Sequence, residues 1–234
     1  MKKILLSVLL CFFLALPAVA QDTTEEPPGE ETASETETDS RMNRDDRNVY
    51  IGFSPFGLHI PTLLTAPFSV GYILNSDWMF GLEYGSLDFE LGDAKGNYTN
   101  QGLYARWYPT TNSFNILMGY HIRSLELDWT YEAKAAGVTY TVDSGIDYSA
   151  QVATVGIGNQ WMMDWGLVIG LDWLMLSGVM GSSFSFTDPT LPGGVQPDAQ
   201  TLADIEKAEK EAQDALDSFS AFPGLFVLSL GFSF

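Results

Sequence analysis

The sequence predicts an all-β fold, a closed eight-stranded antiparallel up-and-down barrel whose strands cross a membrane. Large apolar residues recur at every second position through most of residues 48–234, which is the period of a strand with one apolar face. Turn residues divide these alternating runs into eight. Strands can span hydrocarbon only when every backbone group is paired within the sheet, so we expect the sheet to close on itself.

Residues 1–20 have the features of a secretory signal peptide. Two lysines precede a short apolar core, and small residues lie ahead of a cleavage point at Gln21. The core is too short to cross a membrane as a helix. The single cysteine, Cys11, lies inside this segment. A mature chain that begins at Gln21 would have neither a disulfide nor a thiolate metal site, and we expect no metal and no other cofactor.

Residues 21–47 form an acidic stretch that we predict to be a disordered periplasmic tail. They hold ten carboxylates and no large apolar residue apart from Met42. Two alternatives are a tether to a basic partner or to divalent cations, and a contact of its last residues, 41–47, with the membrane surface. The formal charge of the whole chain is −19, which argues against a nucleic-acid partner.

The barrel domain occupies residues 48–234. Its predicted strands are 48–60, 67–74, 78–85, 98–108, 114–123, 153–158, 165–175 and 223–234. Pro55 weakens the upper half of the first strand because proline cannot donate to a ladder, and a loop over 61–66 follows. After Gly85, and again at Leu125, the apolar phase slips by one residue. A slip reverses the two faces unless a bulge intervenes, so we expect both strands to continue beyond the bilayer there.

The second half of the domain contains two protruding features. The fifth strand is expected to run on past the membrane, turn near 134–137 and return through 138–148 as a hairpin. The seventh strand alternates without a charge on its outer face, which consists of Trp165, Leu167, Ile169, Leu171, Trp173 and Met175. In the loop that follows, the apolar period becomes helical, so we predict a surface helix over 198–219 in the last extracellular loop.

Loop lengths predict the orientation of the barrel. Three connections are tight, at 75–77, 109–113 and 161–164, and they alternate with longer ones. Short periplasmic turns and longer extracellular loops are the usual arrangement in outer-membrane barrels, so both termini should be periplasmic. An aromatic girdle is expected at the tight-turn end. Its residues are Trp78, Trp107, Phe114 and Trp165.

The last strand has the clearest pattern. Its apolar face consists of Phe226, Leu228, Leu230, Phe232 and Phe234. A soluble protein rarely leaves such a face uncovered, because exposed apolar strands aggregate. This ending resembles the C-terminal signal strand of bacterial outer-membrane β-barrels, in which alternating apolar residues and a final Phe are read by the insertion machinery. The resemblance implies the outer membrane of a Gram-negative-type bacterium.

Strand number and length, over Val49 to Phe234, resemble the small barrels of the outer membrane protein A, X and W kinds. An eight-stranded barrel is just wide enough for side chains to fill it, so a diffusion pore is not expected. The class implies a monomer. The partners that it implies are outer-membrane lipid and lipopolysaccharide, the barrel insertion machinery, periplasmic chaperones and an extracellular ligand bound through the loops.

Strand parity places five charged or titratable side chains in the lumen. They are Glu83, Arg106, His121, Arg123 and Asp172. Burying them is costly unless they are paired and hydrogen-bonded, so we predict an internal ion-pair network that plugs the barrel. The alternative is a gate or proton-sensitive site that uses His121, because histidine titrates near physiological pH.

Three further functions are alternatives to this structural role. A lipid A modifying enzyme would need a lipid-facing Ser-His-acid set, but Ser69 and His121 point inward, which leaves only His59 near the outer rim. Binding or passage of a small hydrophobic molecule would use the apolar residues that parity places inside, Ile73, Leu117, Val168, Leu174 and Leu176. Surface interaction would use the hairpin around Lys134 and the acidic helix. We therefore predict a non-enzymatic structural or surface-interaction protein.

Overall fold

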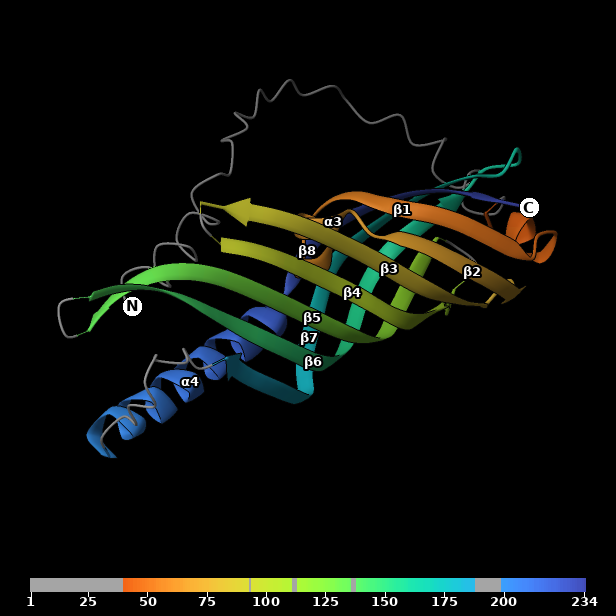
Figure 1. Ribbon diagram of the computed structural model, residues 1–234. Coiled ribbons are helices and arrows are strands. Elements are labelled where there is room, and N and C mark those ends of the chain that lie inside the picture. The colour runs from red at the N-terminus through yellow and green to blue at the C-terminus, as the bar shows by residue number, and fades with distance from the viewer. Residues whose placement is uncertain (1–39, 93, 111–112, 136–137, 188–198) are drawn as a thin grey trace, which may run out of the picture. The chain divides into compact units, whose positions relative to one another are not determined.

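In the residues that the computed structural model describes, 40–92, 94–110, 113–135, 138–187 and 199–234, eight antiparallel strands close into a barrel (Figure 1). Each strand pairs with the next in sequence, and β8 pairs with β1. The backbone oxygen of the last residue, Phe234, accepts hydrogen bonds from the N–H groups of Asn48 and Val49 at 2.9 and 3.2 Å. The predicted barrel is confirmed, while the predicted signal peptide lies outside the described residues.

The strands follow the predicted runs. They are β1 (Val49–Leu58), β2 (Phe68–Asn75), β3 (Trp78–Leu91), β4 (Ala94–Trp107), β5 (Phe114–Ala135), β6 (Val138–Met162), β7 (Leu167–Thr187) and β8 (Gly224–Ser233). The predicted helix of the last loop is α4 (Ala199–Ser220). The predicted loop over 61–66 instead contains a short helix, α3 (Ile60–Thr65), which begins with a proline and ends at Ala66 in the left-handed conformation. Among the described helices, none is both long and apolar enough to cross a membrane.

The wall of the barrel has two heights. Strands β8, β1 and β2 have 8–10 residues, whereas β3 to β7 have 14–25. Figure 1 shows the β5–β6 hairpin extending well past the short strands. The β3–β4 and β4–β5 registers run without a shift, so the phase slips predicted after Gly85 and at Leu125 are not bulges. Both strands simply continue, and their apolar side chains move to the inner face, where Leu125 and Leu127 pack in a second apolar cluster.

A bulge in β7 overturns part of the predicted facing. Gly158 pairs with Asp172 and Ile157 pairs with Leu174, so Trp173 is an extra residue that reverses the phase beyond it. Met175, predicted to face lipid, is buried in the lumen, while Leu174 and Leu176, predicted to face inward, are exposed. Those three assignments are wrong. Before the bulge the predicted phase is kept, and Asp172 is buried.

The segment before β1 is ordered at its end. Residues 40–45 are helical, so the disorder predicted for 21–47 is wrong over its last residues; residues 21–39 lie outside the described ranges. Arg44 is buried, donates from Nε to the backbone oxygen of Ser76 at 2.8 Å, and stacks its guanidinium 3.9 Å from the centre of the Tyr108 ring. Arg47 donates to the backbone oxygen of Ser233 at 2.8 Å. The segment therefore closes the tight-turn end of the barrel.

Candidate functional site

The five predicted lumen residues all lie on the inner side of the wall. Arg106, His121, Arg123 and Asp172 are buried, and Glu83 is partly buried at the edge of an internal cavity. They do not form one network. The structure separates them into three groups. The Arg106–Asp172 ion pair lies near the middle of the barrel, and the Glu83–His121 contact lies closer to the mouth. Arg123 binds the irregular segments at the mouth.

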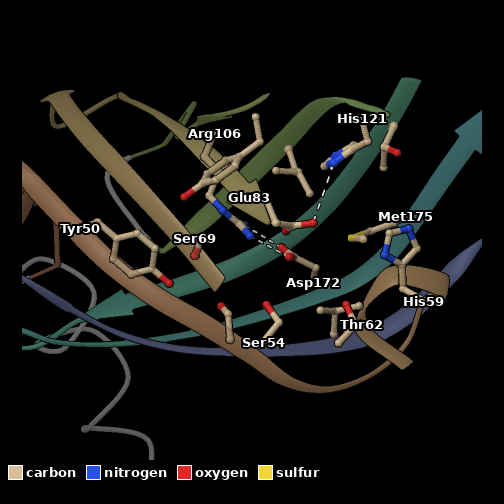
Figure 2. A pocket seen from close by; sticks show the side chains of 15 residues that line it. Tyr50, Ser54, His59, Thr62, Ser69, Glu83, Arg106, His121, Asp172 and Met175 are labelled. Atoms are coloured by element: carbon tan, nitrogen blue, oxygen red, sulfur yellow. Dashed lines mark hydrogen bonds and ion pairs between the residues drawn. The ribbon is translucent and has the colours of Figure 1, made fainter. Parts of the chain in front are cut away.

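The Arg106–Asp172 pair joins β4 to β7 across the lumen. Both terminal nitrogens of the guanidinium donate to the two carboxylate oxygens, at 2.7 and 2.8 Å (Figure 2). One of them also donates to Asn115 Oδ1 at 2.7 Å. This bidentate geometry is the strong form of a charge-assisted hydrogen bond. Because both charges are buried, each needs the other to offset the free-energy cost of its lost hydration.

Glu83 and His121 make the second contact. His121 Nδ1 lies 3.8 Å from Glu83 Oε1, which also accepts from Asn100 Nδ2 at 2.9 Å. Two glycines make room for the imidazole: a Cβ at Gly102 or Gly119 would lie 2.5 Å from a ring nitrogen of His121. The backbone of β4 and β5 thus creates the space that the ring fills.

Arg123 is fully buried but lies apart from both contacts. It donates to the backbone oxygen of Ser220, the last residue of α4, and its NH2 nitrogen lies 3.4 Å from His59 Nε2. His59 is the N-cap residue of α3 and is buried at the mouth. Burial, and to a smaller extent the nearby cations, lower the pKa of His59 well below its ordinary value. Sequence parity placed Arg123 inside, but its partners lie on segments without strand periodicity.

A cavity of about 40 Å³ lies between the two carboxylate contacts and the mouth. Figure 2 shows His59, Glu83, Arg106, His121 and Asp172 around it. Since one water needs roughly 10–15 Å³, the space suits a few waters and not an organic molecule. Three of the five residues proposed for a hydrophobic route, Ile73, Leu117 and Val168, are packed core residues. Ser69 also lines the cavity, so the structure offers no lipid-facing Ser-His pair there.

The predicted surface residues lie on the outer side of the wall. Trp78 stacks on Trp107 with ring centres 6.0 Å apart, and Trp165 lies 6.1 Å from Phe232. Phe114 is half-buried on the outer side of β5, at the same end. In the last strand, Phe226 and Phe234 are exposed, and Leu228 and Leu230 are half-buried. Phe226 has φ of +51°, and the register of β8 with β1 shifts beside it. Among the described residues, no group of three His, Cys, Asp or Glu is placed to hold a metal.

Comparison with known proteins does not define a family. No family model matches the chain, and no curated protein sequence matches it. Crystal structures of CarO and CarO2 from Acinetobacter baumannii are similar to it at 9% and 12% identity, with TM-scores of 0.38 and 0.40. These matches cover 80% of this chain and 96% and 98% of those chains. A major outer membrane protein from Thermus thermophilus matches at 12% identity and a TM-score of 0.42, covering 80% of this chain and 98% of that one.

Proposed function

We propose that the chain is an outer-membrane β-barrel protein of a Gram-negative-type bacterium with a plugged lumen and a structural or surface-interaction role. It performs no catalysis in this proposal. The observation that carries it is the distribution of side chains, because large apolar residues are exposed on the outside of the barrel, whereas its buried charged residues lie inside, beside an apolar cluster. A water-soluble barrel would have the opposite arrangement.

Exposed apolar residues follow the outer face around the circumference. Among the most exposed on the strands are Phe56, Phe68, Leu82, Leu103, Val155, Leu176 and Phe226. On β3 this band ends at Tyr84, and the outer face continues with Ser86, Asp88 and Glu90. The change from apolar to charged on one continuous face fits a strand that leaves hydrocarbon and enters the headgroup region.

The ends of the lumen support the plug. Arg44 fills the tight-turn end, and His59 and Arg123 fill the mouth, with the Arg106–Asp172 pair between them. The cavity of about 40 Å³ beside the Arg106–Asp172 pair is too small for a solute route. We expect the native protein to show no open-channel conductance in planar bilayers. Steady conductance at neutral pH would contradict the plug without contradicting the membrane location.

Partners follow from the same proposal. Outer-membrane lipid and lipopolysaccharide contact the apolar band, and the insertion machinery and periplasmic chaperones handle the chain before it closes. The surfaces available to an extracellular ligand are the β5–β6 hairpin and α4, which pack together above the band through Tyr148 and Leu216.

A pair of substitutions on one strand face tests the membrane location. Leu82→Arg puts a charge near the middle of the band, which costs about 2–4 kcal/mol in a lipid-embedded barrel. Asp88→Arg puts the same charge on the same face beyond the band, where the cost is about 0–1 kcal/mol. We expect only Leu82→Arg to reduce the amount of folded protein in the outer-membrane fraction, where the folded form is recognised by its heat-dependent gel mobility. Equal behaviour of the two variants, or a wild type that stays monomeric without detergent, would contradict the proposal.

A further inference from the structure

The junction between α4 and β8 is held by two buried side chains from distant parts of the chain. Arg123 donates to the backbone oxygen of Ser220, where α4 ends. The ring of His59 packs against Gly224, where β8 begins, so closely that a Cβ there would lie 2.7 Å from the ring. Because His59 Nε2 also lies 3.4 Å from Arg123, the two side chains form one cluster that contacts both sides of the junction.

The contact between Arg123 and His59 requires a neutral imidazole. An arginine has donors and no acceptor, so His59 Nε2 must accept the N–H and carry its own proton on Nδ1. A second proton would sit on Nε2, facing a guanidinium 3.4 Å away. The hydrogen bond would then be lost, and two like charges would be buried against each other.

The surroundings do not compensate such a charge. In the part of the chain that the structure describes, the titratable groups around the cluster are Glu83 on β3, Tyr98 on β4, His121 on β5, Tyr148 on β6 and Asp217 on α4. Glu83 accepts a hydrogen bond from Asn100. Asp217 accepts hydrogen bonds from Tyr148 at 2.8 Å and from Ser182 at 3.0 Å. Among the described residues, neither carboxylate forms an ion pair with His59.

We propose that this junction is an acid-released latch, in which proton uptake by His59 breaks its contact with Arg123 and frees the end of α4 from the barrel mouth. His59 also lines the internal cavity, so its protonation would place a charge in the wall of that cavity. The pKa of His59 is lowered in the closed form, so the latch is intact above the ordinary pKa of about 6.5 and weakens as the pH falls below it. The latch requires the barrel and not its membrane location, so the two proposals can fail separately.

Distance measurement between two spin labels tests the latch. The labels are attached at Ala215→Cys on the exposed side of α4 and Glu126→Cys on the outer face of β5, in the full chain carrying Cys11→Ser. At pH 7.5 we expect one narrow distance distribution. At pH 4.5 at least half of the molecules should show longer, broader distances. In His59→Gln, which keeps an acceptor for Arg123 but cannot be protonated, the distribution should stay narrow at both values.

His121→Gln is the matched control, because it removes the neighbouring imidazole but keeps His59, so the longer distances should still appear at pH 4.5. An unchanged wild-type distribution at pH 4.5 would overturn the latch, and so would a response that persists in His59→Gln. Hydrogen exchange of the wild type gives a second readout if a variant does not fold. After correction for intrinsic rates, amides of 213–224 should exchange at least tenfold faster at pH 4.5, with those of 68–84 unchanged; equal rates would also overturn it.

Discussion

The two ends of the barrel are closed by different chemistry. At the tight-turn end, the side chains of residues 40–47 bind backbone carbonyls of the turns and of β8. At the mouth, His59 and Arg123 bind the α4–β8 junction. The first closure uses arginines, which keep their charge at every physiological pH, whereas the second includes histidine. This difference is the physical basis of the proposal that one end of the barrel is fixed while the other responds to protons.

The ion pair between the two ends should give the largest effect. Asp172→Ala leaves the buried guanidinium of Arg106 without its charge partner, which typically costs about 3–5 kcal/mol. We expect the unfolding midpoint in urea, measured on vesicle-embedded protein by gel mobility, to fall accordingly. The combined variant Arg106→Met with Asp172→Leu removes both charges and should recover most of the loss. A double variant no better than Asp172→Ala would show that packing, and not the buried charge, sets the cost.

At the tight-turn end, Arg44→Ala should give the next largest effect. It removes a charge-assisted hydrogen bond to Ser76 and a stacking contact with Tyr108, together worth about 2–3 kcal/mol. Arg41→Ala is the control, because its ion pair with Asp77 at 3.3 Å is exposed and worth about 0–1 kcal/mol. The loss in Arg44→Ala should be the same at pH 7.5 and pH 5.5. A loss that changes with pH would remove the contrast between the ends.

The regular parts of the fold were predictable because side chains alternate between the two faces of a strand, so apolar residues recur at every second position. That signal placed Arg106 and Asp172 on the inner side of β4 and β7, where the structure pairs them. It failed beyond Trp173, since Leu174, Met175 and Leu176 are all apolar and differ too little in polarity to reveal a reversed phase. A bulge is visible in sequence only when the residues after it differ in polarity.

The closures at the two ends were missed for another reason. The partners of Arg44 are a backbone oxygen and an aromatic ring that lie far away in sequence, and such contacts leave no periodic trace. The composition of 21–47 predicted disorder, because few apolar residues are available there. The partners of Arg123 likewise come from α3 and α4, whose docking depends on tertiary structure. Parity can therefore assign a side chain to the lumen without identifying what it binds.

The smallest effect concerns stability rather than movement of the latch. Protonation of the unfolded chain at His59, with its ordinary pKa near 6.5, destabilises the folded form by up to about 1.4 kcal/mol at pH 5.5. The contribution is fully present above pH 6.5 and is lost as the pH falls toward the lowered pKa of the folded form.

We expect the difference in urea stability between wild type and His59→Gln to shift by this amount in favour of the variant between pH 7.5 and 5.5. The same comparison in the Arg44→Ala background should give an equal shift, because the two closures lie at opposite ends of the barrel. A shift that depends on Arg44 would mean that the ends are coupled through the lumen, and the division into a fixed and a responsive end would then be wrong.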